Sequence, residues 1–168
     1  SRLVDGRHVC DASFQILDGL RADDDETEFG DLLAKYLPAD VQVSSATNTK
    51  STIESLAQQV TERLKSADET THQAVYIVIY DLARFRDLQA SEDDFGLGSF
   101  GDSTSESTSS QFAKLLRDGP SVGIHALIWA DCYHTLSRWI DRATMRDLAQ
   151  RVLFQMSAVD SSHLMDSA

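Results

Sequence analysis

The sequence predicts a three-layer α/β domain built on a mainly parallel sheet. Apolar runs typical of strands alternate along the chain with segments whose apolar residues recur at helical spacing. Such alternation favours parallel strands joined by right-handed crossovers, with helices on both faces. Residues 74–81 are β-branched and aromatic without alternation, which is typical of a strand covered on both faces, and residues 125–130 indicate another continuous strand. The length of 168 residues fits one domain spanning residues 1–168.

The first part of the chain predicts two strands and two helices. Residues 13–18 form an apolar run that stops at a glycine, which indicates a buried strand ending at a turn. Residues 29–36 have helical spacing up to Pro38, and residues 41–43 indicate a short strand. Residues 50–66 form the clearest helix, because their apolar residues share one stripe. These are Ile53, Leu56, Val60 and Leu64.

The second part begins with the predicted buried strand at residues 74–81. Residues 90–110 are rich in Ser, Asp, Glu and Gly, and they predict a flexible loop because they offer too little apolar surface to offset the entropy of ordering. Beyond the loop we expect the following elements in order: a helix over residues 111–117, a strand over 125–130, one or two short helices over 135–150, and a last strand over 151–156.

Composition excludes several classes of protein. Fifteen Lys and Arg against 27 Asp and Glu give a net charge of -12, so this chain alone is not expected to bind nucleic acid. Its two cysteines, Cys10 and Cys132, are too few for a disulfide framework, and we interpret them as reduced thiols of a cytoplasmic protein. The longest apolar run is far shorter than the ~20 residues of a membrane-spanning helix.

Aspartates follow three of the predicted strands. In an open parallel sheet, ligands bind beyond the carboxyl ends of the strands, so Asp18, Asp81 and Asp131 are the first candidate site residues. Asp81 follows the most buried strand, where a P-loop NTPase places the acid that holds Mg²⁺ through water. The alternative is that Asp81 only caps a turn.

Other site patterns are absent or weak. The chain contains no GxxxxGK[ST] phosphate loop, no HxxxH or HExxH pair and no GxSxG elbow. The glycines of residues 96–101 follow no predicted strand, so we assign them to the loop. Arg138, Arg142 and Arg146 recur every four residues and would share one side of a single helix. They would present positive charge to a phosphate or a neighbouring subunit, although such a stripe is more often simply exposed to solvent.

Three blocks of sequence resemble the motor domain of the FtsK/SpoIIIE family of DNA-translocating ATPases. Residues 76–81 (YIVIYD) resemble its Walker B strand. Residues 112–119 and 123–129 resemble its next helix, its "GIH" turn and the core strand that follows. Residues 151–157 and 160–166 resemble its late strand and its "DSRTILD"-like segment. The blocks keep the family's order.

The resemblance implies a RecA-like P-loop NTPase core that lacks its P-loop segment, with the Walker A lysine upstream of Ser1. The parent protein would then use ATP and Mg²⁺, form a hexameric ring, and pull double-stranded DNA or energise protein secretion. Asp81 would be the surviving catalytic residue and would hold Mg²⁺ through water, and Asp131 would lie beside it at the nucleotide.

The chain departs from the family pattern at three positions. Leu82 replaces the glutamate expected beside the Walker B aspartate, Asp131 replaces a polar sensor, and Ser162 replaces an arginine. Without a general base and a phosphate cradle, this chain alone is not expected to bind or hydrolyse ATP. The alternatives are a non-catalytic α/β scaffold derived from such an ATPase, or a flavodoxin-like or Rossmann enzyme, which the acidic turn after residue 18 disfavours.

Overall fold

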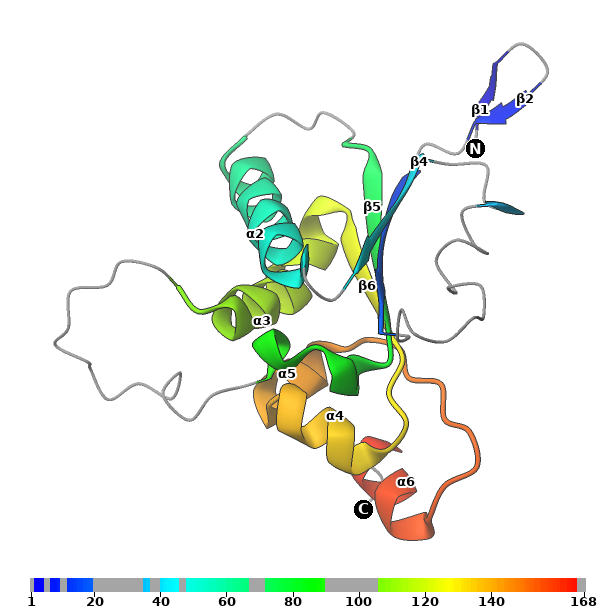
Figure 1. Cartoon of the computed structure of the whole chain (residues 1–168), viewed down its shortest axis with the longest axis vertical. Coiled ribbons are helices and arrows are strands. Elements are labelled where there is room, and N and C mark those ends of the chain that lie inside the picture. The colour runs from blue at the N-terminus through cyan, green and yellow to red at the C-terminus, as the bar shows by residue number, and fades with distance from the viewer. Residues whose placement is uncertain are drawn as a thin grey trace, which may run out of the picture.

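The computed structural model describes residues 2–4, 7–9, 12–19, 35–36, 40–45, 48–66, 72–89 and 106–165. Its main feature is a four-stranded parallel sheet with the order β4-β3-β5-β6 (Figure 1). A separate antiparallel pair precedes it. The strands are β1 (Arg2–Val4), β2 (Arg7–Val9), β3 (Ala12–Asp18), β4 (Asp40–Ser45), β5 (Ala74–Tyr80) and β6 (Ile124–Ile128). The predicted α/β class and parallel sheet are confirmed.

Helices α2 (Thr49–Lys65) and α3 (Thr108–Asp118) pack side by side on one face of this sheet. The face beneath them includes alternate residues of β5, and the helices contribute their apolar stripes. The core includes Leu17, Ile53, Leu56, Val60, Val75, Ile77, Ile79, Phe112, Leu115 and Ile124. The helix predicted over residues 29–36, which would supply the third layer, lies outside the described residues except for Lys35 and Tyr36, which are helical.

The opposite face of the sheet carries an aromatic row. The rings of Phe14 and Tyr76 stack at a centroid distance of 5.3 Å, and the ring of His125 stacks on Tyr76 at the same distance. Tyr76 is 37% exposed and Leu127 is 66% exposed. The expectation that residues 74–81 form a strand covered on both faces is therefore wrong for this structure, because one face of β5 still meets solvent at Tyr76.

Short helices follow the carboxyl edge of the sheet. They are η2 (Leu82–Arg84), η3 (Arg86–Leu88), α4 (Tyr133–Trp139), α5 (Arg142–Asp147) and α6 (Ala158–Met165), while η5 (Gly119–Val122) leads into β6. The prediction of one or two short helices over residues 135–150 is confirmed. None of the helices in the described ranges is long and apolar enough to cross a membrane.

The last predicted strand, residues 151–156, is wrong. This segment joins no sheet, and its side chains Val152 and Phe154 are exposed. Arg151 instead donates hydrogen bonds to the carbonyls of Met145 and Leu164, which ties the segment to the ends of α5 and α6. An apolar run needs a partner strand to become a strand itself, and none of the described strands lies beside this one.

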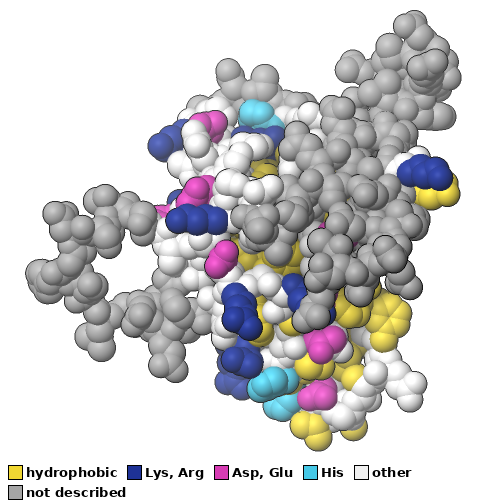
Figure 2. Space-filling model, viewed as in Figure 1, with side chains coloured by type: hydrophobic (Ala, Val, Ile, Leu, Met, Phe, Trp, Pro, Cys, Tyr) yellow, Lys and Arg dark blue, Asp and Glu magenta, His cyan; other side chains and the backbone are white. Residues whose placement is uncertain are grey.

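The arginine stripe is not on a single helix. α4 ends at Trp139, the backbone of Ile140 is extended, and Asp141 begins α5 by accepting the N–H of Thr144 at 2.6 Å. This cap outcompetes continuation of the helix, so Arg138 belongs to α4 and the other two arginines belong to α5. Figure 2 still shows Lys and Arg side chains gathered over these two helices.

The boundary of the predicted loop also differs. Residues 108–110, which were expected in the flexible loop, form the first turn of α3, because the hydroxyl of Ser107 accepts the N–H of Ser110 at 3.1 Å. This is a serine N-cap. Residues 90–105 lie outside the described part of the chain.

Two elements of the structure were not predicted, although the sequence contains signals for both. Asp5-Gly6 stands between β1 and β2, and this dipeptide is the strongest short hairpin signal. Ser157 precedes α6, where its hydroxyl accepts the N–H of Asp160 at 3.1 Å and donates to the carboxylate of Asp160 at 2.8 Å. A serine followed three residues later by an acid is a helix-start pattern.

Candidate functional site

The three aspartates predicted from the strand ends lie along one edge of the sheet. β3, β5 and β6 are parallel neighbours, so their carboxyl ends share this edge. Asp18 is the buried last residue of β3, Asp81 directly follows β5, and Asp131 follows β6 after Trp129 and Ala130. β5 is an inner strand, so Asp81 has a strand on each side of it.

Asp81 has a constrained backbone. Its φ of 62° is the only positive φ among the described non-glycine residues, and this left-handed conformation costs energy for a residue with a side chain, although Asp and Asn tolerate it best. The turn is held because the N–H of Leu82 donates to the carbonyl of Trp129 at 3.1 Å and the N–H of Trp129 donates to Ile79 at 2.9 Å. The position of Asp81 is therefore fixed by β5 and β6 together.

Gly19 brings the end of β3 against this turn. Its N–H donates to the carbonyl of Tyr80 at 3.0 Å. A Cβ on Gly19 would lie 2.7 Å from the Tyr80 oxygen and 2.9 Å from Cγ of Arg84, which is too close for any larger residue without a shift. The sequence indicated a turn at this glycine, but only the packed strands show the close approach.

Asp131 has an altered proton affinity. The side chain of Thr135 donates a hydrogen bond that lowers the pKa of Asp131, and bonds from Cys132 lower it further. Thr135 lies in the first turn of α4, where Cys132 is the N-cap residue. The carboxylate of Asp131 is therefore held in its charged form at the start of α4.

We expect Thr135→Val to raise the pKa of Asp131 toward its ordinary value, because this variant keeps the side-chain shape but removes the hydroxyl. A lowered pKa in the folded chain means that Asp131 contributes stability above its unfolded pKa and loses it as the pH falls through the folded pKa. An NMR pH titration of the Asp131 carboxyl carbon measures the change, and an unchanged midpoint would contradict this role of Thr135.

The described residues do not form a ready-made metal centre. Among them, no group of three or more His, Cys, Asp or Glu side chains could hold a metal ion. Magnesium fits such a place only through a carboxylate, water and the phosphates of a substrate, and Asp81 can supply the carboxylate. Gly19 is the described glycine at this edge and already donates its N–H to Tyr80, so a phosphate cradle would come from residues outside the described ranges.

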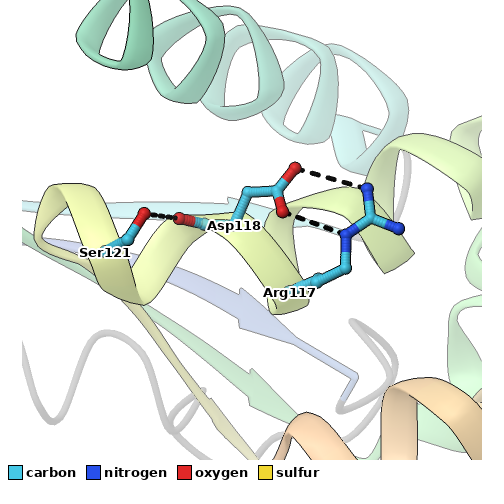
Figure 3. Close-up of polar contacts among 3 residues, drawn as sticks. All are labelled: Arg117, Asp118 and Ser121. Carbon is cyan, nitrogen blue, oxygen red and sulfur yellow. Dashed lines mark hydrogen bonds and ion pairs between the residues drawn. The ribbon is translucent and has the colours of Figure 1, made fainter.

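A second polar cluster lies at the other edge of the sheet. Arg117 and Asp118 form an ion pair at the end of α3, with Nε 2.9 Å from Oδ1, and Ser121 donates to the Asp118 carbonyl at 2.6 Å (Figure 3). The hydrogen bond from Arg117 lowers the pKa of Asp118. Because α3 leads through η5 to the start of β6, this cluster ends a helix and lies away from Asp81.

Comparisons with known proteins leave the family open. No family model, curated protein or solved structure matches this chain. The geometry of the carboxyl edge is therefore the basis of the functional interpretation.

Proposed function

We propose that this chain is part of the motor domain of an FtsK/SpoIIIE-like, ATP-dependent DNA translocase. The observation that carries the proposal is the place of Asp81: it ends an inner, apolar strand of a parallel sheet and lies at the edge where such sheets bind ligands. A Walker B aspartate requires this arrangement. In the parent protein Asp81 holds Mg²⁺ through water, with Asp131 nearby at the nucleotide.

The unpaired edge of β6 and the exposed face of the sheet both support the proposal. Within the described part of the chain, β6 pairs only with β5, and the face bearing Leu127 and Tyr76 is exposed. A further strand beside β6 would end next to Asp131, as expected of a strand that carries a phosphate loop.

The handedness of the connections indicates which face of the sheet a helix after the phosphate loop would cover. α2 connects β4 to β5 and α3 connects β5 to β6, so both connections run toward β6, and both helices lie on one face. A right-handed connection that returns from beyond β6 toward β3 must cross the opposite face. A helix following a Walker A loop would therefore cover the exposed aromatic row.

The proposed parent protein carries its Walker A lysine before Ser1 and forms a hexameric ring. Its cargo is double-stranded DNA or a secreted protein. The chain described here contributes the Mg²⁺-side carboxylate and the core strands. Its net charge of -12 means that basic DNA contacts come from elsewhere in the ring.

The test is ATP binding by a longer protein that includes the residues before Ser1. Isothermal titration with ATP and Mg²⁺ should show binding that Asp81→Asn weakens roughly tenfold or more, since a charged contact is lost. Asn tolerates the left-handed backbone, so the turn is preserved. Asp87→Asn, an exposed aspartate of η3, is the matched control and should bind like wild type.

One observation favours the second candidate, a non-catalytic scaffold with the same fold. Leu82 lies where the family has its catalytic glutamate, and it is fully buried in the core, so a carboxylate at this position would lose its hydration. No heat at any ATP concentration, in a longer protein that has a GKT or GKS loop, would support the scaffold over the motor.

A further inference from the structure

The segment between α5 and α6 presents large apolar side chains to solvent. Val152 is 81% exposed and Phe154 is 78% exposed, whereas Leu153 between them is half-buried. Val159 and Met165 are also exposed and extend this apolar surface onto α6. Figure 2 shows hydrophobic side chains gathered over α6 and the segment before it. Neighbouring exposed apolar groups of this kind are typical of a surface that binds another protein.

The backbone of this segment also lacks partners. Within the ranges that the structure describes, no hydrogen bond involves the backbone N–H or C=O groups of residues 152–156. The start of the segment is nevertheless held in place, because Arg151 donates hydrogen bonds to the carbonyls of Met145 and Leu164. A neighbouring strand can pair such backbone groups and cover the apolar side chains at the same time, whereas a helix leaves the backbone groups unpaired. The surface therefore fits a partner that approaches as a strand.

The charge pattern favours a second copy of this chain as that partner. Residues 152–159 contain no charged side chain, although the whole chain has a net charge of -12. Two chains that are so acidic repel each other, and this uncharged segment lets them touch without bringing carboxylates together. Val152 and Phe154 lie two residues apart, which is the spacing of side chains on one face of a strand. Antiparallel pairing about a two-fold axis would therefore place the apolar side chains of both copies side by side.

We propose that residues 152–156 pair with the same residues of a second copy as antiparallel strands, which makes the chain a two-fold dimer. Each copy supplies the partner strand that the other lacks. A single pair of short strands is marginal in water, so the dimer is weak, with a Kd on the order of 0.1–1 mM, and dilute chain is monomeric. The inference does not depend on the proposed function, because it involves neither Asp81 nor ATP.

The first experiment is sedimentation equilibrium of the 168-residue chain, from dilute solution up to about 1 mM. We expect a monomer–dimer equilibrium that strengthens as salt is added, because salt screens the repulsion between two acidic chains. Phe154→Ser should raise the Kd roughly tenfold or more, since a two-fold dimer loses the aromatic ring from both copies. The matched control is Leu127→Ser, which removes an exposed apolar side chain from β6 instead and should leave the Kd unchanged.

The second experiment locates the contact by NMR. The backbone amide signals of residues 152–156 should shift as the protein concentration rises through the Kd. A sample that mixes isotope-labelled and unlabelled chains should give nuclear Overhauser effects between these residues in different copies, because paired antiparallel strands bring their backbones close together.

Several results would overturn the inference. A chain that stays monomeric up to the highest concentration would leave the surface to a strand from another protein or from the residues before Ser1. A dimer that weakens with salt, or that Leu127→Ser weakens as much as Phe154→Ser, would use a different surface. Intermolecular contacts outside residues 152–156, or assembly beyond a dimer, would also contradict a closed two-fold pairing. None of these results bears on ATP binding by the longer protein, so the proposed function is tested separately.

Discussion

Phe85→Ala should destabilise the chain by about 3–5 kcal/mol, the range for deleting a buried aromatic side chain. Phe85 lies between η2 and η3, directly beyond Asp81, and is 2% exposed within the main core. Its carbonyl accepts the indole N–H of Trp139 at 2.9 Å. The ring therefore anchors the turn after β5 to the core, while its backbone ties that turn to α4.

Phe154→Ala is the matched control for this variant. Phe154 is 78% exposed in the segment between α5 and α6, so the same substitution should change stability by no more than about 0.5 kcal/mol. Urea unfolding followed by circular dichroism measures both variants. Equal losses in the two would contradict the role of Phe85 as a buried anchor of this turn.

Ile77→Ala should cost about 2–5 kcal/mol, because it opens a cavity in the middle of the sheet. Ile77 is fully buried on the face of β5 that α2 and α3 cover. The register pairs Val78 with Leu127, so Ile77 and Leu127 point to opposite faces of the sheet. Substitutions of these two residues therefore compare the covered face of the sheet with the exposed face.

Leu127→Ala should cost no more than about 0.5 kcal/mol in this chain, because its side chain is already largely in water. In a longer protein whose added helix covers the aromatic row, the same variant should cost about 2 kcal/mol or more. Thermal or urea unfolding of the four proteins gives the comparison. A small loss of stability in both the 168-residue chain and the longer protein would contradict the proposal that a helix covers this face.

Local patterns were sufficient for the elements that dominate the core. β5 matches the predicted strand, and α2 matches the predicted apolar stripe except at Leu64, which is exposed. In both cases the apolar residues of one face are buried in the core, so their local spacing carries the signal. The placement of Asp81 and Asp131 at one edge also followed from the strand ends and the parallel class.

Sequence patterns gave wrong predictions where contacts with another segment determine the local structure. Residues 151–156 have the composition of a strand but pair with no described strand, and most of their side chains are exposed. The three arginines would have shared one side of a single helix, but the cap at Asp141 places them on two helices. The ion pair of Arg84 with Asp81 was not predicted, although the two residues are only three apart in the sequence. It depends on the shape of the turn after β5, and the packed strands determine that shape.

The sequence by itself determined the α/β class, the main strands and helices, and the aspartates at their ends, because these depend on the periodicity of neighbouring residues. Tertiary structure alone decided the strand order, the left-handed turn at Asp81, the close approach of Gly19 and the exposed face around Leu127. These features arise from contacts between segments far apart in the chain, and no local pattern of apolar and polar residues encodes which segments meet.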